Sequence, residues 1–418
     1  MQACHLDCAR QIALGQELLS DIAQASLTKP QKSLDLLQGL EILIAWSVTM
    51  FPHSKKKAKR IHLRYHYNLH SFQLTNLLFL ARSICVSLGF NESQDGTKMQ
   101  EHTSSCLEQM RAFAGCYYLV TLVFTTNKKP DAFMNTSYLE ACCRVIGSKM
   151  ECATDELLIY LVKIQQLAQS ISMTLAFRNN SSLQVDLPVT IIIKSFQQQL
   201  EAFKNSVPMS LADNSSIMAH FHIAEMLLYE IGVQDVQATA SLPATDRLEL
   251  LWSCLNATKT FLNIRFSEPL SEHPRFICMA SFDFVYSLIL CLKLMTLNSP
   301  GWDLNTIRKQ LSFDELVTRQ ASDLRMLAER RSRGRGTVGA ALADPFLRLA
   351  TRLEQFNEVL RMELGSAPQM SEMTPVEALA QTSQDFVQDL DSSFWQAMFT
   401  MNPSENLQTT ADAPWPYC

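Results

Sequence analysis

The sequence predicts an all-α fold, a multi-helical array of antiparallel helix pairs that ends in a disordered acidic tail. Apolar residues recur at spacings of three and four through most of residues 1–364, which is the period of an amphipathic helix. Glycine is rare, at 12 of 418 residues, and strand-like runs are few and short. From residue 365 onward this period gives way to a polar, acidic composition that is typical of a flexible segment.

The expected helices follow one another closely along the chain. Gly89 stands at the end of the second, where a glycine can take the left-handed conformation that terminates helices. Thr154 is followed by Asp155 and Glu156, which is the pattern of a hydroxyl N-cap with acidic residues in the first turn. In chain order the expected helices are 34–46, 72–90, 107–126, 154–172, 189–203, 216–231, 247–261, 276–297, 304–330 and 344–364.

The most apolar stretch, residues 278–297, is nearly long enough to span a lipid bilayer. It also contains Asp283 and Lys293, and charged side chains are costly inside a membrane. We therefore expect a buried helix and no membrane partner. The opening residues, MQACHLDCARQ, lack the basic and apolar regions of a secretory signal, so the 12 cysteines are expected to be reduced thiols.

Common motifs of catalysis do not occur in the sequence. It contains no G-x-S-x-G nucleophile motif, no phosphate-binding P-loop and no H-E-x-x-H zinc motif. The G-x-G-x-x-G match at residues 334–339 follows a charged helical segment, whereas a dinucleotide site needs a preceding strand. We therefore predict that the protein is not an enzyme and has no catalytic residue.

Several motifs occur in a distinctive order. KSLDLLQGLEILIAW is followed by YHYNLHSFQLTNLLFLARSICVSLGF, then by MRAFAGCYYLVTLVF at residues 110–124, TSYLEACCRVI and ATDELLIYLVKIQQLAQSI, with Gly301-Trp302-Asp303 further on. In this order they resemble the regulatory, or middle homology, region of fungal zinc-cluster transcription factors, of the type found beside secondary-metabolite genes. The resemblance covers residues 1–364, which form one helical regulatory region, and leaves residues 365–418 as a flexible acidic and aromatic tail.

The resemblance implies a nuclear regulator of transcription that controls a biosynthetic gene cluster. The family normally begins with six cysteines, paired as C-x2-C, that hold two zinc ions and present a helix to DNA. This sequence contains no C-x2-C, so we expect no zinc or other cofactor, and contact with nucleic acid only indirectly. The expected partners are a DNA-bound transcription factor, which includes a homodimer or heterodimer partner, and a transcriptional coactivator. Two alternatives stay open: a truncated or wrongly predicted gene whose true product is a DNA-binding activator, and a helical scaffold outside transcription.

An atypical basic insert, residues 47–64, separates two family motifs that normally follow each other almost directly. Three interpretations stay open. Its length of 18 codons suits a retained fungal intron. Alternatively it is a solvated loop, or a nuclear localisation signal read through exposed charge. The residues of that signal would be Lys55, Lys56, Lys57, Lys59 and Arg60.

The tail has seven acidic residues, no lysine and no arginine. Within it, residues 383–399 alternate acids with apolar side chains, so that the acids keep the aromatic groups solvated until they dock in a hydrophobic groove of a partner. We expect an activation segment that contacts a coactivator, with a helix packed on the chain's own core as the alternative. The residues of this segment are Asp385, Phe386, Asp389, Leu390, Asp391, Phe394, Trp395 and Phe399.

Overall fold

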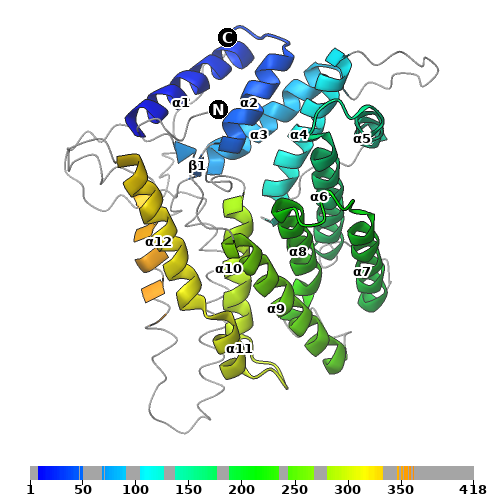
Figure 1. Ribbon diagram of the computed structural model, residues 1–418, viewed down its shortest axis with the longest axis vertical. Helices are drawn as coiled ribbons and strands as arrows, with labels where there is room; N and C mark the ends of the chain where they lie inside the picture. Colours follow the sequence, from blue (N-terminus) through cyan, green and yellow to red (C-terminus); the bar gives the residue numbers. More distant parts are fainter. Residues whose placement is uncertain are drawn as a thin grey trace, which may run out of the picture.

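The computed structural model has α-helices in nearly every segment where the sequence shows the helical period (Figure 1). It describes residues 8–46, 48–49, 68–69, 71–90, 104–126, 137–176, 188–234, 243–267 and 280–332, with some of the positions between 346 and 361. Twelve α-helices lie in these ranges, together with one two-stranded parallel pair, β1 (Val48–Thr49) and β2 (Asn68–Leu69). The predicted all-α fold class is confirmed.

The helices divide into two groups along the chain. The first group comprises α1 (Cys8–Ala23) with its π-helical continuation η2 (Gln24–Thr28), α2 (Leu34–Trp46), α3 (Ser71–Ser87), α4 (Ser104–Thr126), α5 (Ser137–Lys149) and α6 (Asp155–Ala176). The second comprises α7 (Val189–Ser206), α8 (Ser215–Tyr229), the 3-10 turn η3 (Glu230–Val233), α9 (Ala244–Ser267), α10 (Ala280–Thr296), α11 (Leu304–Leu311) and α12 (Phe313–Ser332).

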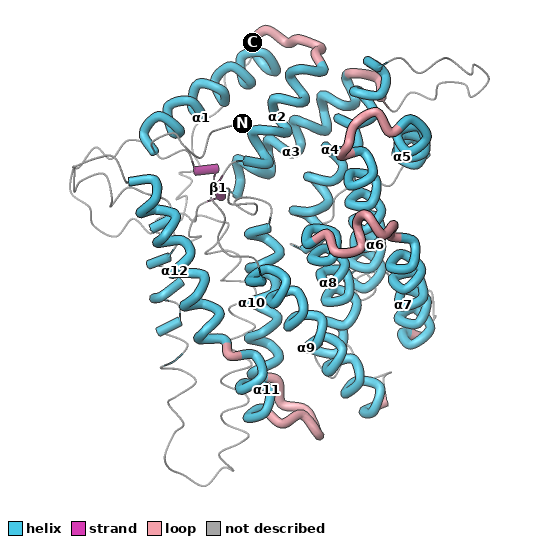
Figure 2. Tube along the Cα trace, in the orientation of Figure 1, coloured by secondary structure: helices cyan, strands magenta, loops and turns pink. Residues whose placement is uncertain are grey.

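Neighbouring helices form antiparallel pairs, as the sequence predicts. In the pair of α3 and α4, the Phe79 ring lies 5.6 Å from that of Phe124, and the Phe90 ring lies 6.0 Å from that of Phe113, so the two helices run in opposite directions. Helices α4, α6 and α8 pack side by side in that order, with α5 and α7 on their outer side (Figure 2). Helix α9 continues this row beyond α8.

Two large apolar cores fill most of the space between the helices, and a smaller apolar cluster joins α12 to Phe346 and Ala350. The first lies among α1 to α5 and the beginning of α6, and the second among α6 to α12. Helix α10 reaches both, because Phe282 belongs to the first core, and Phe284, Tyr286 and Leu288 belong to the second. A seam therefore runs between the cores, and α4, α6, α8 and α10 meet along it.

Most predicted helix boundaries agree with the structure to within a few residues, and three differences have physical reasons. The segment expected as one helix, 304–330, is divided at Ser312, whose φ of 41° lies in the left-handed region. Helices α1 and α5 were not expected. Helix α5 buries only a narrow stripe, and α1 leaves Leu14 and Leu18 exposed, so each contributes only a few side chains to the core.

The expectation of a buried helix at 278–297 is confirmed for its described part, α10. Its described side chains from Phe282 to Leu292 are all buried, and Lys293 is half-buried. Within the described residues, no helix is both long and apolar enough to cross a membrane.

Candidate functional site

Helix α4 carries the motif MRAFAGCYYLVTLVF, and its polar residues contact several neighbouring helices. The helix has 23 residues, and most of the residues that follow Leu107 are buried. An aromatic or apolar motif residue can serve any core, but a buried polar side chain needs a specific partner. The partners of these polar residues define the candidate site.

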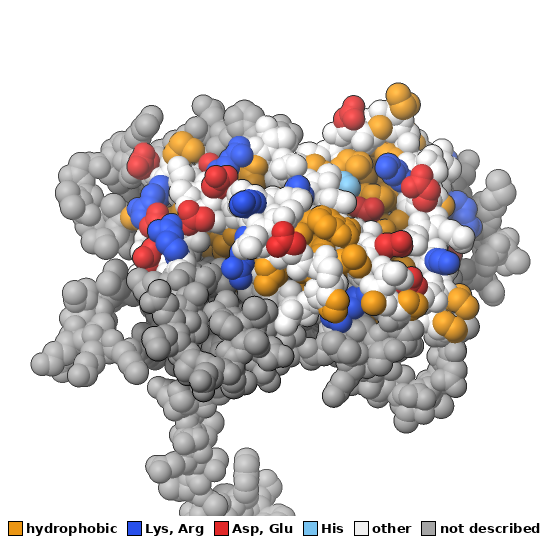
Figure 3. Space-filling view, turned by 90° about the horizontal axis from the view of Figure 1, so that it is seen from below, with side chains coloured by type: hydrophobic (Ala, Val, Ile, Leu, Met, Phe, Trp, Pro, Cys, Tyr) orange, Lys and Arg blue, Asp and Glu red, His pale blue; other side chains and the backbone are white. Residues whose placement is uncertain are grey.

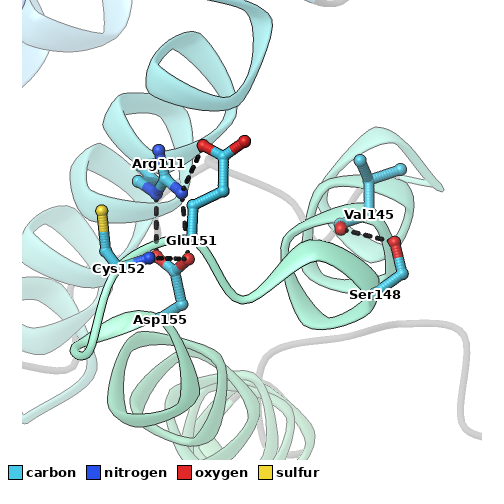
Figure 4. Close-up of polar contacts among 6 residues, drawn as sticks. All are labelled: Arg111, Val145, Ser148, Glu151, Cys152 and Asp155. Carbon is cyan, nitrogen blue, oxygen red and sulfur yellow. Dashed lines mark hydrogen bonds and ion pairs between the residues drawn. The ribbon is translucent and has the colours of Figure 1, made fainter. Parts of the chain in front are cut away.

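Arg111 joins α4 to the beginning of α6 (Figure 4). Its Nε and Nη2 donate to the two carboxylate oxygens of Asp155 at 2.8 and 2.9 Å, which is the strong two-point geometry of arginine and carboxylate. Asp155 also accepts from the backbone N–H of Cys152 at 3.0 Å, and Glu151 lies 3.5 Å from the guanidinium. The hydrogen bonds from Arg111 hold the pKa of Asp155 below its usual range. In the same view, Ser148 donates to the carbonyl of Val145 and closes the last turn of α5.

Gly115 lets α2 come close to α4. A methyl group at this position would lie 3.3 Å from Oε2 of Glu41. The other oxygen of that carboxyl, Oε1, is buried and has no hydrogen-bond partner among the described residues. Burial, with a smaller contribution from the neighbouring Cys85, raises the pKa of Glu41 well above its usual value.

Cys116 follows Gly115 and lies beside Cys85 of α3. The hydrogen bond between the two thiols, followed by burial, raises the pKa of Cys116. Both side chains are fully buried, as are Cys254 and Cys291 in the second core. A thiol buried in an apolar environment is a poor nucleophile and a poor metal ligand, so these cysteines act as packing residues.

The two tyrosines of the motif reach the next helices. The hydroxyl of Tyr117 donates to Oε1 of Gln169 on α6 at 2.8 Å. The hydroxyl of Tyr118 lies 2.8 Å from Nε2 of His220 on α8. Burial raises the pKa of both tyrosines, so both stay protonated and able to donate.

His220 is the centre of a buried polar network at the seam between the two cores. Its Nδ1 lies 3.3 Å from Nε2 of Gln165 on α6 and 3.4 Å from Oδ2 of Asp283 on α10. The second oxygen of Asp283 is buried and has no hydrogen-bond partner among the described residues. On α9, burial lowers the pKa of Arg265 to about 10, against the opposing charges of Asp283 and Asp323.

The chemistry of this arrangement is that of a connector. Hydrogen bonds from α4 join it to α6 and α8, and through His220 to α10. Gly115 and Cys116 let α2 and α3 pack closely against it. In the described part of the chain, no group of three or more His, Cys, Asp or Glu side chains is arranged to hold a metal ion.

The candidate site residues predicted from the sequence lie outside the described residues. This holds for the basic tract at Lys55, Lys56, Lys57, Lys59 and Arg60, and for the whole tail after residue 364. The structure therefore places neither of them, and both stay predictions. Sequence reasoning found the α4 motif, but it missed Glu41 and His220 as its partners. The usable signal was Asp283, a carboxylate inside the most apolar stretch, which requires a polar partner elsewhere.

One face of the molecule, seen in Figure 3, mixes charges of both signs with small groups of apolar side chains. Acidic and basic side chains alternate across its described part, whereas a nucleic-acid-binding face is usually a continuous basic stripe.

Comparison with known proteins finds three curated relatives, all named as transcription factors of fungi. The chain is 24% identical over 386 residues to transcription factor opdL of Penicillium oxalicum, which covers 90% of this chain and 65% of the relative. It is 23% identical over 279 residues to transcription factor himD of Aspergillus japonicus, and this alignment covers 64% of this chain and 44% of the relative. It is 22% identical over 312 residues to a transcription factor of Aspergillus terreus, and this alignment covers 70% of this chain and 43% of the relative.

The aligned part of the chain spans less than two thirds of the length of each of these relatives. No family model matches the chain. No solved structure matches it either.

Proposed function

We propose that the chain belongs to a family of fungal transcription factors and that it regulates transcription of a secondary-metabolite gene cluster. One observation carries the proposal: the similarity to named transcription factors extends through most of the helical body, which includes the motif on α4. The proposed role is non-catalytic, in keeping with the names of the relatives. The helical body presents binding surfaces to other proteins, and α4 holds its helices in one arrangement.

The proposed route to DNA is through a partner. No C-x2-C zinc motif occurs in these 418 residues, and the mixed charge of the face in Figure 3 differs from a basic nucleic-acid-binding stripe. A DNA-bound transcription factor, in a homodimer or heterodimer, would supply the sequence-specific contacts. The regulator would then add its tail to a promoter that the partner selects.

The proposed contact with the transcription machinery is the acidic and aromatic segment at residues 383–399. Its apolar anchors are Phe394, Trp395 and Phe399, and the interleaved Asp385 and Asp389 keep them solvated. Large aromatic side chains dominate the energy of such interfaces, whereas flanking acids mainly affect encounter and solubility. Loss of the aromatic residues should therefore reduce activation more than loss of the acids.

A tethering experiment tests this proposal. The full chain is fused to a heterologous DNA-binding domain upstream of a reporter gene in a fungal host. We expect activation that the triple variant F394A/W395A/F399A loses. The matched control M370A/M373A/V376A removes three apolar residues from the same tail and should keep it. Equal loss in both variants, or no activation by the full chain, would count against an activation segment.

Nuclear residence follows from the proposed function, and the basic tract is the candidate import signal. A fluorescent fusion in which all five basic residues of the tract are changed to alanine should leave the nucleus if the tract is the working signal. Retention of that fusion in the nucleus would assign import to another segment. Cytoplasmic residence of the unaltered chain would favour a helical scaffold outside transcription.

Sequencing of the transcript tests the remaining alternative. If the message carries an upstream zinc-cluster reading frame and joins codon 46 to codon 65, the protein reads DNA itself and the basic insert is a retained intron. If codons 47–64 are present in the mature message, the insert is part of the protein.

A further inference from the structure

One ring nitrogen of His220 on α8, Nδ1, has two neighbours: one requires a lone pair on it, and the other requires a proton. Gln165 presents its amide nitrogen, a donor, 3.3 Å from Nδ1 and therefore needs a lone pair there. Asp283 presents a carboxylate oxygen 3.4 Å from the same atom and therefore needs a proton there. A single nitrogen cannot satisfy both at once.

The tautomers of the neutral ring divide these contacts between them. With its proton on Nε2, His220 donates to Tyr118 and accepts from Gln165, and Asp283 receives no proton from the ring. With its proton on Nδ1, the ring donates to Asp283 and accepts from the hydroxyl of Tyr118, and Gln165 loses its acceptor. Tyr118 fits either state because a hydroxyl both donates and accepts.

We propose that His220 is a proton-sensitive switch at the seam: uptake of one proton from solvent moves the contact of Nδ1 from Gln165 on α6 to Asp283 on α10. The imidazolium carries a proton on each nitrogen, so it donates to Tyr118 and to Asp283 together. The new pair is oppositely charged and nearly fully buried, and in such surroundings a charge-assisted hydrogen bond is about twice as strong as a neutral one.

The switch has a structural consequence because α10 belongs to both cores. Phe282, next to Asp283, packs in the first core, and Phe284 packs in the second. Protonation strengthens the contact of His220 with α10 and breaks its hydrogen bond with Gln165 on α6. The relative positions of the helices at the seam then depend on whether His220 carries one ring proton or two.

The other charged groups near the network do not compete for Nδ1 of His220. Arg265 of α9 acts on Asp283 from the second core, and its ζ carbon lies 4.3 Å from the centre of the Phe284 ring. On α8 itself, His222 is paired separately, with its Nδ1 2.7 Å from the carboxylate of Glu225. His222 therefore offers a matched control, two positions along the same helix and outside the network.

The experiment compares the full-length protein with H220Q, D283N and H222Q by urea unfolding at pH 8 and pH 6. We expect the folded-to-unfolded ratio of the wild type, relative to H220Q, to be about tenfold larger at pH 6 than at pH 8, since a charged hydrogen bond contributes about that much. The folded-to-unfolded ratio of D283N should lack this increase at pH 6, as that of H220Q does. The ratio of H222Q should differ from that of the wild type by only about twofold. An advantage over H220Q that is equal at both pH values, or smaller at pH 6, would overturn the proposal.

A spectroscopic measurement separates the switch from a merely structural role. In a protein labelled with 15N-histidine, the resonances missing from H220Q identify the ring of His220. We expect Nδ1 to gain a proton between pH 8 and pH 6 in the wild type, and at a lower pH in D283N. An Nδ1 that stays unprotonated at pH 6, or that titrates identically in D283N, would contradict the switch.

Discussion

At the scale of single residues, the α4 motif is a set of polar groups that each require one partner. Arginine at 111 supplies two parallel donors to one carboxylate, which lysine cannot do. Glycine at 115 leaves room for a carboxyl of α2. The hydroxyl of Tyr118 can donate to His220 or accept from it, which phenylalanine cannot. The chemistry of each side chain accounts for its place in the motif without a catalytic role.

The pair of Arg111 and Asp155 should contribute measurably to stability. Asp155→Asn keeps the size of the side chain but removes its charge, and we expect a loss of about 2 kcal/mol in the free energy of unfolding at pH 7. Because Arg111 lowers the pKa of Asp155 in the folded state, this contribution is present above the usual range of about pH 4 and disappears in more acidic solution. Urea titrations between pH 7 and pH 3 measure it.

A surface pair provides the control. Arg325 and Glu354 form an ion pair with both side chains exposed, so E354Q should change the free energy of unfolding by less than about 1 kcal/mol. Similar effects of D155N and E354Q would show that the buried position of Asp155 does not strengthen its contribution to the free energy of unfolding.

Glu41 should behave in the opposite way. Burial raises its pKa in the folded protein, so the wild type loses stability as the pH rises from about 4.5 through that raised value. Glu41→Gln has the same shape and carries no charge. We expect it to be more stable than the wild type by about 1–2 kcal/mol at pH 8 and equal to it near pH 4. A variant that is less stable at pH 8 would mean that the carboxylate has a stabilising partner.

At the scale of elements, the sequence predicts the positions of helices more accurately than the points at which they break. The apolar period runs through residues 304–330, yet α11 ends and α12 begins at Ser312, which has a left-handed backbone. Glycine usually takes this conformation, and a serine gives no such signal. In α10 the sequence shows that Asp283 and Lys293 need partners. It cannot show that these are His220 and Glu230, because those contacts join residues some sixty positions apart.

The left-handed turn predicts a stabilising substitution. A residue with a side chain pays about 1 kcal/mol or more in this conformation, and glycine does not. We expect Ser312→Gly to raise the free energy of unfolding by about 0.5–1 kcal/mol, measured by thermal or urea unfolding. Ser312→Ala should give no such gain, since alanine keeps the strain and loses the hydrogen bond to the carbonyl of Lys309. Destabilisation by glycine would contradict the assigned conformation.

At the scale of the whole molecule, two apolar cores share a seam at which α4, α6, α8 and α10 exchange polar contacts. The fold class and the order of most helices could be predicted, because periodicity is local. The network at the seam could not, because each of its members comes from a different helix. The basic tract and the acidic tail are a different case. They were predicted from composition and from the family resemblance, and they lie outside the described residues.

Removal of the tail tests whether the helical body accounts for stability and the tail for activation. A chain of residues 1–364 contains both cores, so we expect a thermal midpoint within a few degrees of that of the full chain. The same truncation should abolish activation in the tethering experiment. A large fall in the midpoint would instead support the alternative in which residues 383–399 pack as a helix on the chain's own core.

We propose that this protein regulates transcription at promoters selected by a DNA-bound partner. The most direct measurement combines chromatin immunoprecipitation of the tagged full chain with transcript profiling of a strain that lacks it. The account predicts that the chain occupies the promoters of one cluster of biosynthetic genes, that their transcripts change on deletion, and that occupancy disappears when the partner is removed. Absence of promoter occupancy, together with unchanged transcripts, would contradict it.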